Sequence, residues 1–488
     1  MTMKNQHSLM IRKIIIAAIA LIWLISVPSS LMIVGFSSFH PFEETYYAAL
    51  PKLVKRLSTS KRKKVIIIGT SSVAFGVNGK LLEEELNSAS LDYDVVPFGL
   101  YGSLGTKLMI DLSKDYISEG DIVIFQPEFT SQTMSTYFSC KETYRAIDND
   151  FSLFNKLSSV DKKSMILNYS SFVSEKYSYL KENKKVSSSG VYSYSSFDEN
   201  GDLTYTRENN QIPSYVDTNN LIDLTQRFIK DDFKEYVKTY VSFVKKKNAE
   251  IYFHYSPMNA SAITSLSNEI IDSLSTYLQE SFSMNLLGNL NDSIFEKEYF
   301  YDSNFHLNDV GMNNYTLLLS DEIKTLKNVT KKNNHSLMDK PALPSSDGDS
   351  NVDNSTYDNQ DEDCFEYKKV DDGYKIISLK SNLSKSSLIV PYSHLNEKIT
   401  EIDESVFSNQ NIVNEVTIQQ NIKRLKNNMF ASSSISKVHI KENDSTKISV
   451  GFNLLSDQNI SIYVPKGSLS SYLGNYSWSY YSSYLFEE

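Results

Sequence analysis

The chain has 488 residues, a formal net charge of −10 and 22% charged side chains. That length allows two or three domains with cores of their own, and the ordinary share of charge gives no general signal for binding nucleic acid. The two cysteines, Cys140 and Cys364, fall in different predicted domains, which excludes a disulfide scaffold and a thiolate metal cluster. We therefore expect no nucleic-acid partner, no metal ion and no other cofactor.

An uncharged apolar stretch covers residues 14–36, after a short tail, residues 1–13, that ends in Arg12 and Lys13. As a helix rising about 1.5 Å per residue, the stretch is long enough to cross a hydrocarbon core roughly 30 Å thick. A cleaved signal peptide is the alternative, but its apolar region would span about 7 to 15 residues and end at an Ala-x-Ala type of site, of which we see no convincing example. The sequence therefore predicts a single transmembrane anchor with a cytoplasmic tail.

Basic residues lie on both sides of this anchor and bear on its orientation. Three precede it, whereas seven follow it: Lys52, Lys55, Arg56, Lys61, Arg62, Lys63 and Lys64. Charge alone would keep the more basic side, and with it the body of the protein, in the cytoplasm. Residues 37–63 are predicted to form a helical neck whose basic face either lies near anionic lipid or wall polymer or is simply solvated.

Strand-like and helix-like runs alternate through residues 64–330. The strand-like runs are 65–68, 95–98, 122–125 and 251–254. This alternation is typical of a parallel sheet wrapped by helices, so we expect an α/β fold in the form of a three-layer sandwich. Residues 131–220 break the rhythm with many Ser, Tyr and Lys residues, and we interpret them as an insertion that covers one edge of the sheet and forms a lid or a substrate wall.

The first strand ends at Gly69, and Thr70, Ser71 and Ser72 follow it. Such a turn would hold Ser71 at the carboxyl edge of the sheet, where open α/β sheets bind their ligands. A serine hydroxyl becomes a good nucleophile when an imidazole takes its proton and a carboxylate orients that imidazole. His306 is the candidate base, and Asp302, one helical turn upstream, is the candidate carboxylate. The alternative is a plain helix cap after the strand and a structural histidine at the last helix.

Residues 331–363 are rich in Asp, Ser and Asn and are predicted to be an acidic, disordered linker. A repeat follows it in residues 364–488. Two segments recur at offsets of 22 and 23 residues, namely 413–418 with 435–440, and 399–407 with 422–430. Both periods fall in the range of about 20 to 29 residues that is typical of leucine-rich repeats, so we expect a short β-solenoid that the aromatic residues of 472–484 close as a cap.

The segments around Ser71 and His306, together with the loop 99–105, resemble the SGNH/GDSL esterase superfamily over roughly residues 62–330. The likeness is greatest to membrane-anchored, extracytoplasmic members such as the teichoic-acid D-alanyl transfer protein and polysaccharide O-acetyltransferases. It implies that Ser71 is the nucleophile, His306 the base and Asp302 the orienting acid, with the backbone N–H groups of Ser71 and Gly102 as the oxyanion hole. It also implies a single-pass cell-membrane protein with an extracytoplasmic body and a membrane-bound acyltransferase as partner.

Two positions depart from the superfamily pattern. The acid usually stands three residues before the histidine, where this chain has Ser303. An asparagine usually follows the third strand and donates to the oxyanion hole, whereas Glu128 stands here and cannot donate when ionised. Glu128 and Ser72 are predicted to line the site, where Glu128 would orient His306, bind a substrate amine or hydroxyl, or mark a site without hydrolytic power. His254, at the end of another strand, either approaches the site or is a satisfied core residue.

The C-terminal repeats resemble the BspA-like leucine-rich repeats of bacterial surface proteins, a likeness that implies a binding or spacing module without naming its ligand. Together these patterns predict a surface-anchored serine esterase or O-acyltransferase that acts on acyl groups of a cell-envelope glycan or teichoic acid. The rival prediction is a non-catalytic surface adhesin or scaffold, in which the SGNH-like domain is degenerate and the repeats bind a partner.

Overall fold

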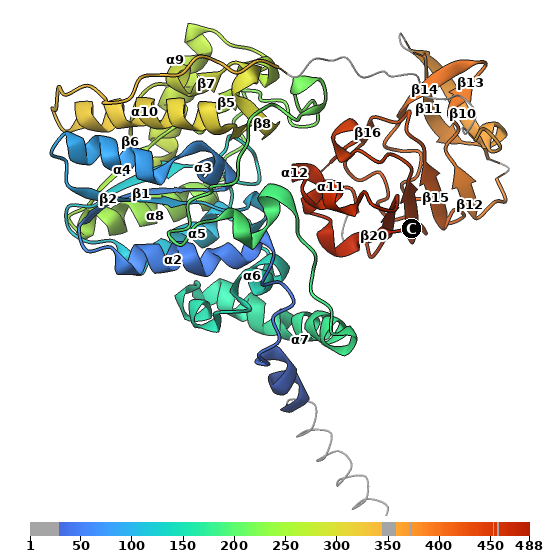
Figure 1. Cartoon of the computed structure of the whole chain (residues 1–488), viewed down its shortest axis with the longest axis horizontal. Coiled ribbons are helices and arrows are strands. Elements are labelled where there is room, and N and C mark those ends of the chain that lie inside the picture. The colour runs from blue at the N-terminus through green and yellow to red at the C-terminus, as the bar shows by residue number, and fades with distance from the viewer. Residues whose placement is uncertain (1–28, 344–357, 371–372, 382, 452, 456–457) are drawn as a thin grey trace, which may run out of the picture.

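The computed structural model describes residues 29–343, 358–370, 373–381, 383–451, 453–455 and 458–488. It is a mixed α/β structure with parallel sheets (Figure 1). An α/β part, coloured blue to yellow, is followed by a part built mostly of strands, coloured orange to red. The last helices of the second part face the α/β part.

The α/β part is built on a five-stranded sheet in the order β2-β1-β3-β4-β6, and all its strands are parallel. The strands are β1 (Lys63–Gly69), β2 (Tyr93–Phe98), β3 (Ile122–Gln126), β4 (Glu250–Phe253) and β6 (Asn285–Leu286). The first four lie where the sequence predicted strands. Residues 65–68 of β1 are buried on both faces, which explains why this strand is a continuous β-branched run instead of an alternating one.

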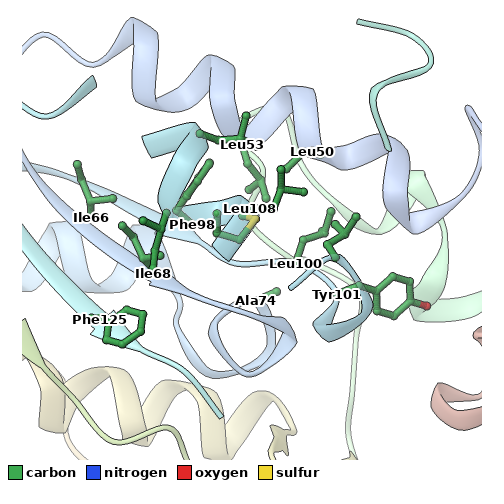
Figure 2. Packing of buried hydrophobic residues seen from close by; sticks show 14 of the residues in the cluster. Leu50, Leu53, Ile66, Ile68, Ala74, Phe98, Leu100, Tyr101, Leu108 and Phe125 are labelled. Atoms are coloured by element: carbon green, nitrogen blue, oxygen red, sulfur yellow. The ribbon is translucent and has the colours of Figure 1, made fainter. Parts of the chain in front are cut away.

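Helices cover both faces of this sheet (Figure 1). They are α2 (Leu50–Thr59), α5 (Thr106–Ser113), α8 (Asp231–Lys246) and α9 (Asn268–Phe282) in one core, and α4 (Gly79–Ser88) and α10 (Asp309–Leu326) in the other. Successive residues of a strand point to opposite faces. Ile66 and Ile68 therefore pack into the first core, near Leu50, Leu53 and Leu108 (Figure 2), whereas Val65 and Ile67 pack into the second.

The predicted insertion contains two helices that the sequence pattern did not indicate, α6 (Cys140–Ile147) and α7 (Ser159–Glu182). The pattern of α7 is weak because apolar residues lie on its inner and outer faces alike. Met165 and Phe172 are buried, while Ile166 and Leu167 are exposed. The remainder of the insertion runs through short 3-10 turns, one of which brings the hydroxyl of Tyr192 to Asp302.

Residues 37–63, predicted as a basic neck, pack against the sheet instead. Helix α2 buries one apolar face, and two arginines of this segment form ion pairs within the domain. Arg56 pairs with Glu83 at 3.0 Å, and Arg62 pairs with Asp94 at 2.7 Å. These two arginines are therefore engaged with the α/β part, whereas Lys55, Lys61 and Lys63 are exposed to solvent.

The predicted anchor and the predicted linker lie at the two ends of the α/β part, and the described residues cover each of them only in part. None of the helices in the described ranges has the length and apolar character needed to cross a bilayer. The predicted span, residues 14–36, lies mostly outside the described residues, which begin within it at a helical turn, 29–35. Of the predicted linker, residues 344–357 also lie outside them, whereas Asn334 and His335 donate their backbone N–H groups to Glu85 on α4.

Short strands complete the α/β part. They are the parallel pair β5 (Met258–Asn259) and β7 (Ile294–Phe295) and the antiparallel hairpin β8 (Phe300–Ser303) and β9 (His306–Leu307). The helix α3 (Ser71–Gly76) directly follows β1 and packs against β9. This contact brings the two candidate segments of the sequence together.

In the C-terminal part, five parallel strands form one sheet in the order β12-β15-β17-β19-β20. They are β12 (Ser387–Ile389), β15 (Glu415–Ile418), β17 (Lys437–Ile440), β19 (Ser461–Val464) and β20 (Leu485–Glu487). The register pairs Val416 with Val438, residues that the 22-residue offset also aligns. Phe407 and Phe430, which the second offset aligns, pack inside with ring centroids 6.0 Å apart.

The rest of this part flanks that stack. A second sheet has four strands, β10 (Phe365–Val370), β11 (Gly373–Leu379), β14 (Glu397–Ile402) and β13 (Ser393–His394), and β16 (Arg424–Leu425) pairs with β18 (Ser449–Val450). Two short helices, α11 (Leu469–Leu473) and α12 (Tyr476–Ser479), lie between β19 and β20. We call residues 469–484 the C-terminal cap; it lies against the α/β part (Figure 1).

Candidate active site

Ser71 lies at the carboxyl edge of the sheet, as the first residue of α3. Gly69 ends β1 there, and a side chain at this position would bring its Cβ to 2.3 Å from the carbonyl oxygen of Gln126, so the tight turn requires glycine. Thr70 then stands at the N-cap position, directly before the helix. The side chains of Thr70, Ser71 and Ser72 are all fully buried.

The structure brings Asp302 and His306 together. Asp302 Oδ1 lies 2.8 Å from His306 Nδ1, and both side chains are almost fully buried. The β8–β9 hairpin spans the four-residue step between them, so a looped segment and not a helical turn brings Asp302 to the imidazole. The second carboxylate oxygen of Asp302 accepts a hydrogen bond of 2.6 Å from the hydroxyl of Tyr192, a residue that the sequence analysis did not single out.

Packing fixes the plane of the His306 imidazole. The Phe75 ring of α3 stacks on it with centroids 4.0 Å apart and an interplanar angle of 11°. Because Nδ1 faces the Asp302 carboxylate, the hydrogen-bond pattern assigns the proton to Nδ1 and leaves Nε2 as an acceptor. Nε2 is buried and has no hydrogen-bond partner among the described residues. A buried acceptor without a hydrogen-bond partner destabilises a fold, so such groups are rare. A general base, however, needs a nitrogen whose lone pair is free to take a proton, and Nε2 of His306 meets that need.

The hydroxyl of Ser71 bonds to Glu128 and not to His306. Glu128 Oε1 accepts from the Ser71 hydroxyl at 3.1 Å, the Thr70 hydroxyl at 2.8 Å and the Ser72 N–H at 3.0 Å. One of the three roles predicted for Glu128 was to orient His306, but no contact between the two side chains is seen in the described part of the chain. Glu128 instead holds the loop that carries the candidate nucleophile.

Gly102, the second predicted oxyanion donor, begins a buried 3-10 turn after β2. Strands β1 and β2 are parallel neighbours, so Gly102 and Ser71 lie at the same edge of the sheet. The carbonyl of Gly102 accepts from Gln132 Nε2 at 3.1 Å, which anchors this turn to the start of the insertion.

His254 has a structural environment. Its Nε2 lies 2.8 Å from Glu322 Oε2, and its Nδ1 lies 2.9 Å from the hydroxyl of Tyr315. Both ring nitrogens are therefore satisfied in the core, as expected of the structural alternative.

Aromatic residues of the C-terminal cap complete the surroundings of His306. The ring of Tyr476 lies edge-on to the imidazole, with centroids 4.3 Å apart, and 5.9 Å from the ring of Tyr192. Burial raises the pKa of Tyr476 well above its usual value, and the negative charge of Glu128 raises it further. The aromatic residues of 472–484 were predicted only to cap the solenoid. Their spacing gives no sign of the contact with His306, which lies 170 residues before Tyr476 in the chain.

A small cavity of about 130 Å³ opens between the two parts of the chain beside Asp302. Its other lining residues include Gln211, Thr218, Lys423, Arg424, Asn475 and Ser477. Within the described ranges, no group of three His, Cys, Asp or Glu side chains is placed to hold a metal ion. No protein-family model matches the sequence, and no curated protein matches it. The chemistry of the site is therefore inferred from its own side chains.

Proposed function

We propose that the protein is a serine esterase or O-acyltransferase that acts on acyl groups of a cell-envelope glycan or teichoic acid. The observation that carries this proposal is the buried Asp302–His306 pair, whose unpartnered Nε2 lies on a hairpin packed against the helix that Ser71 begins. The proposal includes the finer fold: an SGNH-type three-layer sandwich, similar to flavodoxin, followed by a leucine-rich-repeat solenoid.

The proposed reaction proceeds through an ester of Ser71. Its Oγ attacks the acyl carbonyl while His306 Nε2 takes the proton, and Asp302 stabilises the imidazolium through Nδ1. The leaving alcohol then recovers that proton as its bond to the acyl carbon breaks. In the second half, His306 deprotonates water or a glycan hydroxyl, which attacks the ester and releases Ser71. Water makes the enzyme a deacylase, and a glycan hydroxyl makes it a transferase.

The bond from Ser71 to Glu128 sets the conditions for this reaction. The hydroxyl must leave the carboxylate and turn to His306 before it can lose its proton. A hydrogen bond to a charged group contributes about 1.5–3 kcal/mol, so the resting arrangement disfavours attack. The carboxylate also opposes the negative charge that develops on the substrate oxygen. Both effects favour slow, selective transfer over general hydrolysis.

Exposed apolar side chains support a position at the membrane. Ile33, in the first described turn, is 73% exposed, and Leu167 on α7 is 72% exposed. The two elements touch, since the hydroxyl of Tyr169 donates to the carbonyl of Leu31 at 3.2 Å. This apolar end includes the last residues of the predicted anchor, so we propose that it rests on the lipid surface of the cell membrane. The extracytoplasmic side and a membrane-bound acyltransferase partner are proposed from the superfamily resemblance.

The alternative function is a non-catalytic scaffold or adhesin. It is favoured by one observation, that Ser71 bonds to Glu128 while His306 Nε2 is left without a hydrogen-bond partner. The buried, paired state of Asp302 opposes it, because a relict site would have no reason to keep a carboxylate on the imidazole.

Covalent labelling separates these functions. We expect a fluorophosphonate to modify Ser71 of the native chain and an acyl ester to be turned over, with both activities lost in Ser71→Ala. Ser320→Ala is the matched control, since Ser320 is equally buried but lies on α10, away from the site. Unchanged turnover in Ser71→Ala would exclude the esterase function.

A further inference from the structure

Neither Ser71 nor His306 has any exposed surface. Part of their cover comes from the far end of the chain. Tyr476, on α12 of the C-terminal cap, lies edge-on to the imidazole of His306 with centroids 4.3 Å apart and ring planes at 68°. The space next to His306, where an ester would have to lie, is therefore occupied by a side chain of the repeat part.

The contact around Tyr476 is packed as closely as a domain interior. The hydroxyls of Tyr101 and Ser479 form a buried hydrogen bond of 2.8 Å, and the rings of Tyr101 and Tyr480 lie 5.1 Å apart. Backbones also meet, because a Cβ added at Gly474 would lie 3.6 Å from the Cα of Gly190. Gly190 belongs to the same short turn as Tyr192, which holds Asp302.

Polar contacts extend this interface along α6. Arg145 Nη2 donates to the hydroxyl of Ser483 at 3.1 Å, and Lys141 Nζ donates to the hydroxyl of Tyr484 at 2.6 Å. The contacts at this face combine aromatic packing with a few hydrogen bonds. The two sides have hydrophobic cores of their own and are joined by the segment 331–363, so the interface can separate without unfolding either side.

We infer that the C-terminal cap is a plug for the proposed active site, with Tyr476 as the residue that closes it. An acyl ester reaches Ser71 only when the cap leaves Tyr101, Gly190 and His306. The cavity beside Asp302 does not replace this route, because neither Ser71 nor His306 lines it. A ligand of the repeats that binds the separated form more tightly than the docked form would thus switch on acyl transfer. The inference about transfer rests on the proposed function, whereas the closure itself does not.

The closure is tested in the full chain by the reactivity of a thiol placed at the nucleophile. Ser71→Cys is combined with Cys140→Ala and Cys364→Ala, and the rate of reaction with a small maleimide is measured. Gly474→Arg forces a large side chain between the cap and Gly190, so we expect the rate to rise about tenfold or more, since reactivity follows the open fraction. Ser470→Arg, on the exposed side of the same helix, is the matched control and should leave the rate unchanged. Equal rates with and without Gly474→Arg would overturn the plug.

Tyr476→Ala provides a second opening variant in case Gly474→Arg does not fold, and a thermal unfolding curve of each variant checks this. We expect faster thiol reaction with Tyr476→Ala as well, and an unchanged rate there would also overturn the plug. Fluorophosphonate labelling of Ser71 in the chain with native cysteines separates the two proposals. Faster thiol reaction without any fluorophosphonate adduct in the opened variants supports the plug and excludes the esterase.

Discussion

The hydroxyl of Ser71 donates to Glu128 across 3.1 Å, while the free nitrogen of His306 has no hydrogen-bond partner in the described part of the chain. In a serine esterase the hydroxyl is activated by the imidazole, so this pairing holds the candidate nucleophile away from the candidate base. The residue that holds it stands where the superfamily that the sequence resembles usually has an asparagine. Glu128 is thus the point at which the site departs most from a general hydrolase.

Glu128→Gln should accelerate acylation of Ser71. The amide oxygen can still accept from the loop, while the negative charge that opposes the oxyanion is gone and the amide N–H₂ can donate to it. We expect fluorophosphonate labelling to be about tenfold faster, which corresponds to about 1.4 kcal/mol of the barrier. Glu84→Gln, an exposed glutamate on α4, is the control. A slower reaction in Glu128→Gln would mean that the carboxylate activates the hydroxyl.

The spacing of Asp302 and His306 can be tested by moving the carboxylate. Neighbouring residues of β8 point to opposite sides, and the hydroxyl of Ser303 accepts from the backbone of Phe305 instead of facing the imidazole. The double change Asp302→Ser with Ser303→Asp gives the spacing that is usual in the superfamily that the sequence resembles, yet it should lower the labelling rate by about 10² to 10⁴, as we also expect of Asp302→Ala. If the double variant keeps the native rate, the hairpin does not determine the pairing.

Tyr192 is predicted to be a positioning residue for Asp302. Tyr192→Phe removes its hydrogen bond of 2.6 Å and keeps the ring packed between Tyr46 and Tyr101. Loss of one hydrogen bond to a charged group should slow acylation about tenfold or more, and it should lower the melting temperature by only a few degrees, because one buried carboxylate oxygen loses its partner. The pH profile of the labelling rate should shift as well, which a merely structural tyrosine would not cause. Tyr194→Phe, in the next turn, is the control.

The pH dependence of stability should reflect Asp202. Burial, and then the charge of Asp198, raises the pKa of Asp202 to about 7, against about 3.9 for an unfolded aspartate. The folded state then binds more protons than the unfolded state between these values, so stability falls as pH rises from about 4 to 7 and levels off above. Asp202→Asn should therefore melt higher than the native chain at pH 8 and equally at pH 4. Asp223, whose pKa is lowered by Thr225, should give no such gain when replaced by Asn.

Parts of this site follow from local sequence. The run at 65–68 and Gly69 indicate a buried strand and a tight turn, which are properties of adjacent residues. The Asp302–His306 pair was predicted too, but the sequence did not decide between a helical turn and a loop, because a step of four residues suits both. The bond from Ser71 to Glu128 and the contact of Tyr476 with His306 join residues far apart in the chain. Such contacts are determined only by how separate elements pack together, so no local sequence pattern predicts them.

The central claim is that Ser71 is a nucleophile activated by His306, and peptide mass spectrometry of the acylated protein tests it most directly. The full chain with Tyr476→Ala would be incubated with a fluorophosphonate, alone and together with His306→Ala. The account predicts a phosphonyl adduct on the peptide that carries Ser71, formed at least about a hundredfold more slowly when His306 is replaced. An unmodified Ser71 in the opened chain, or equal rates with and without His306, would contradict it.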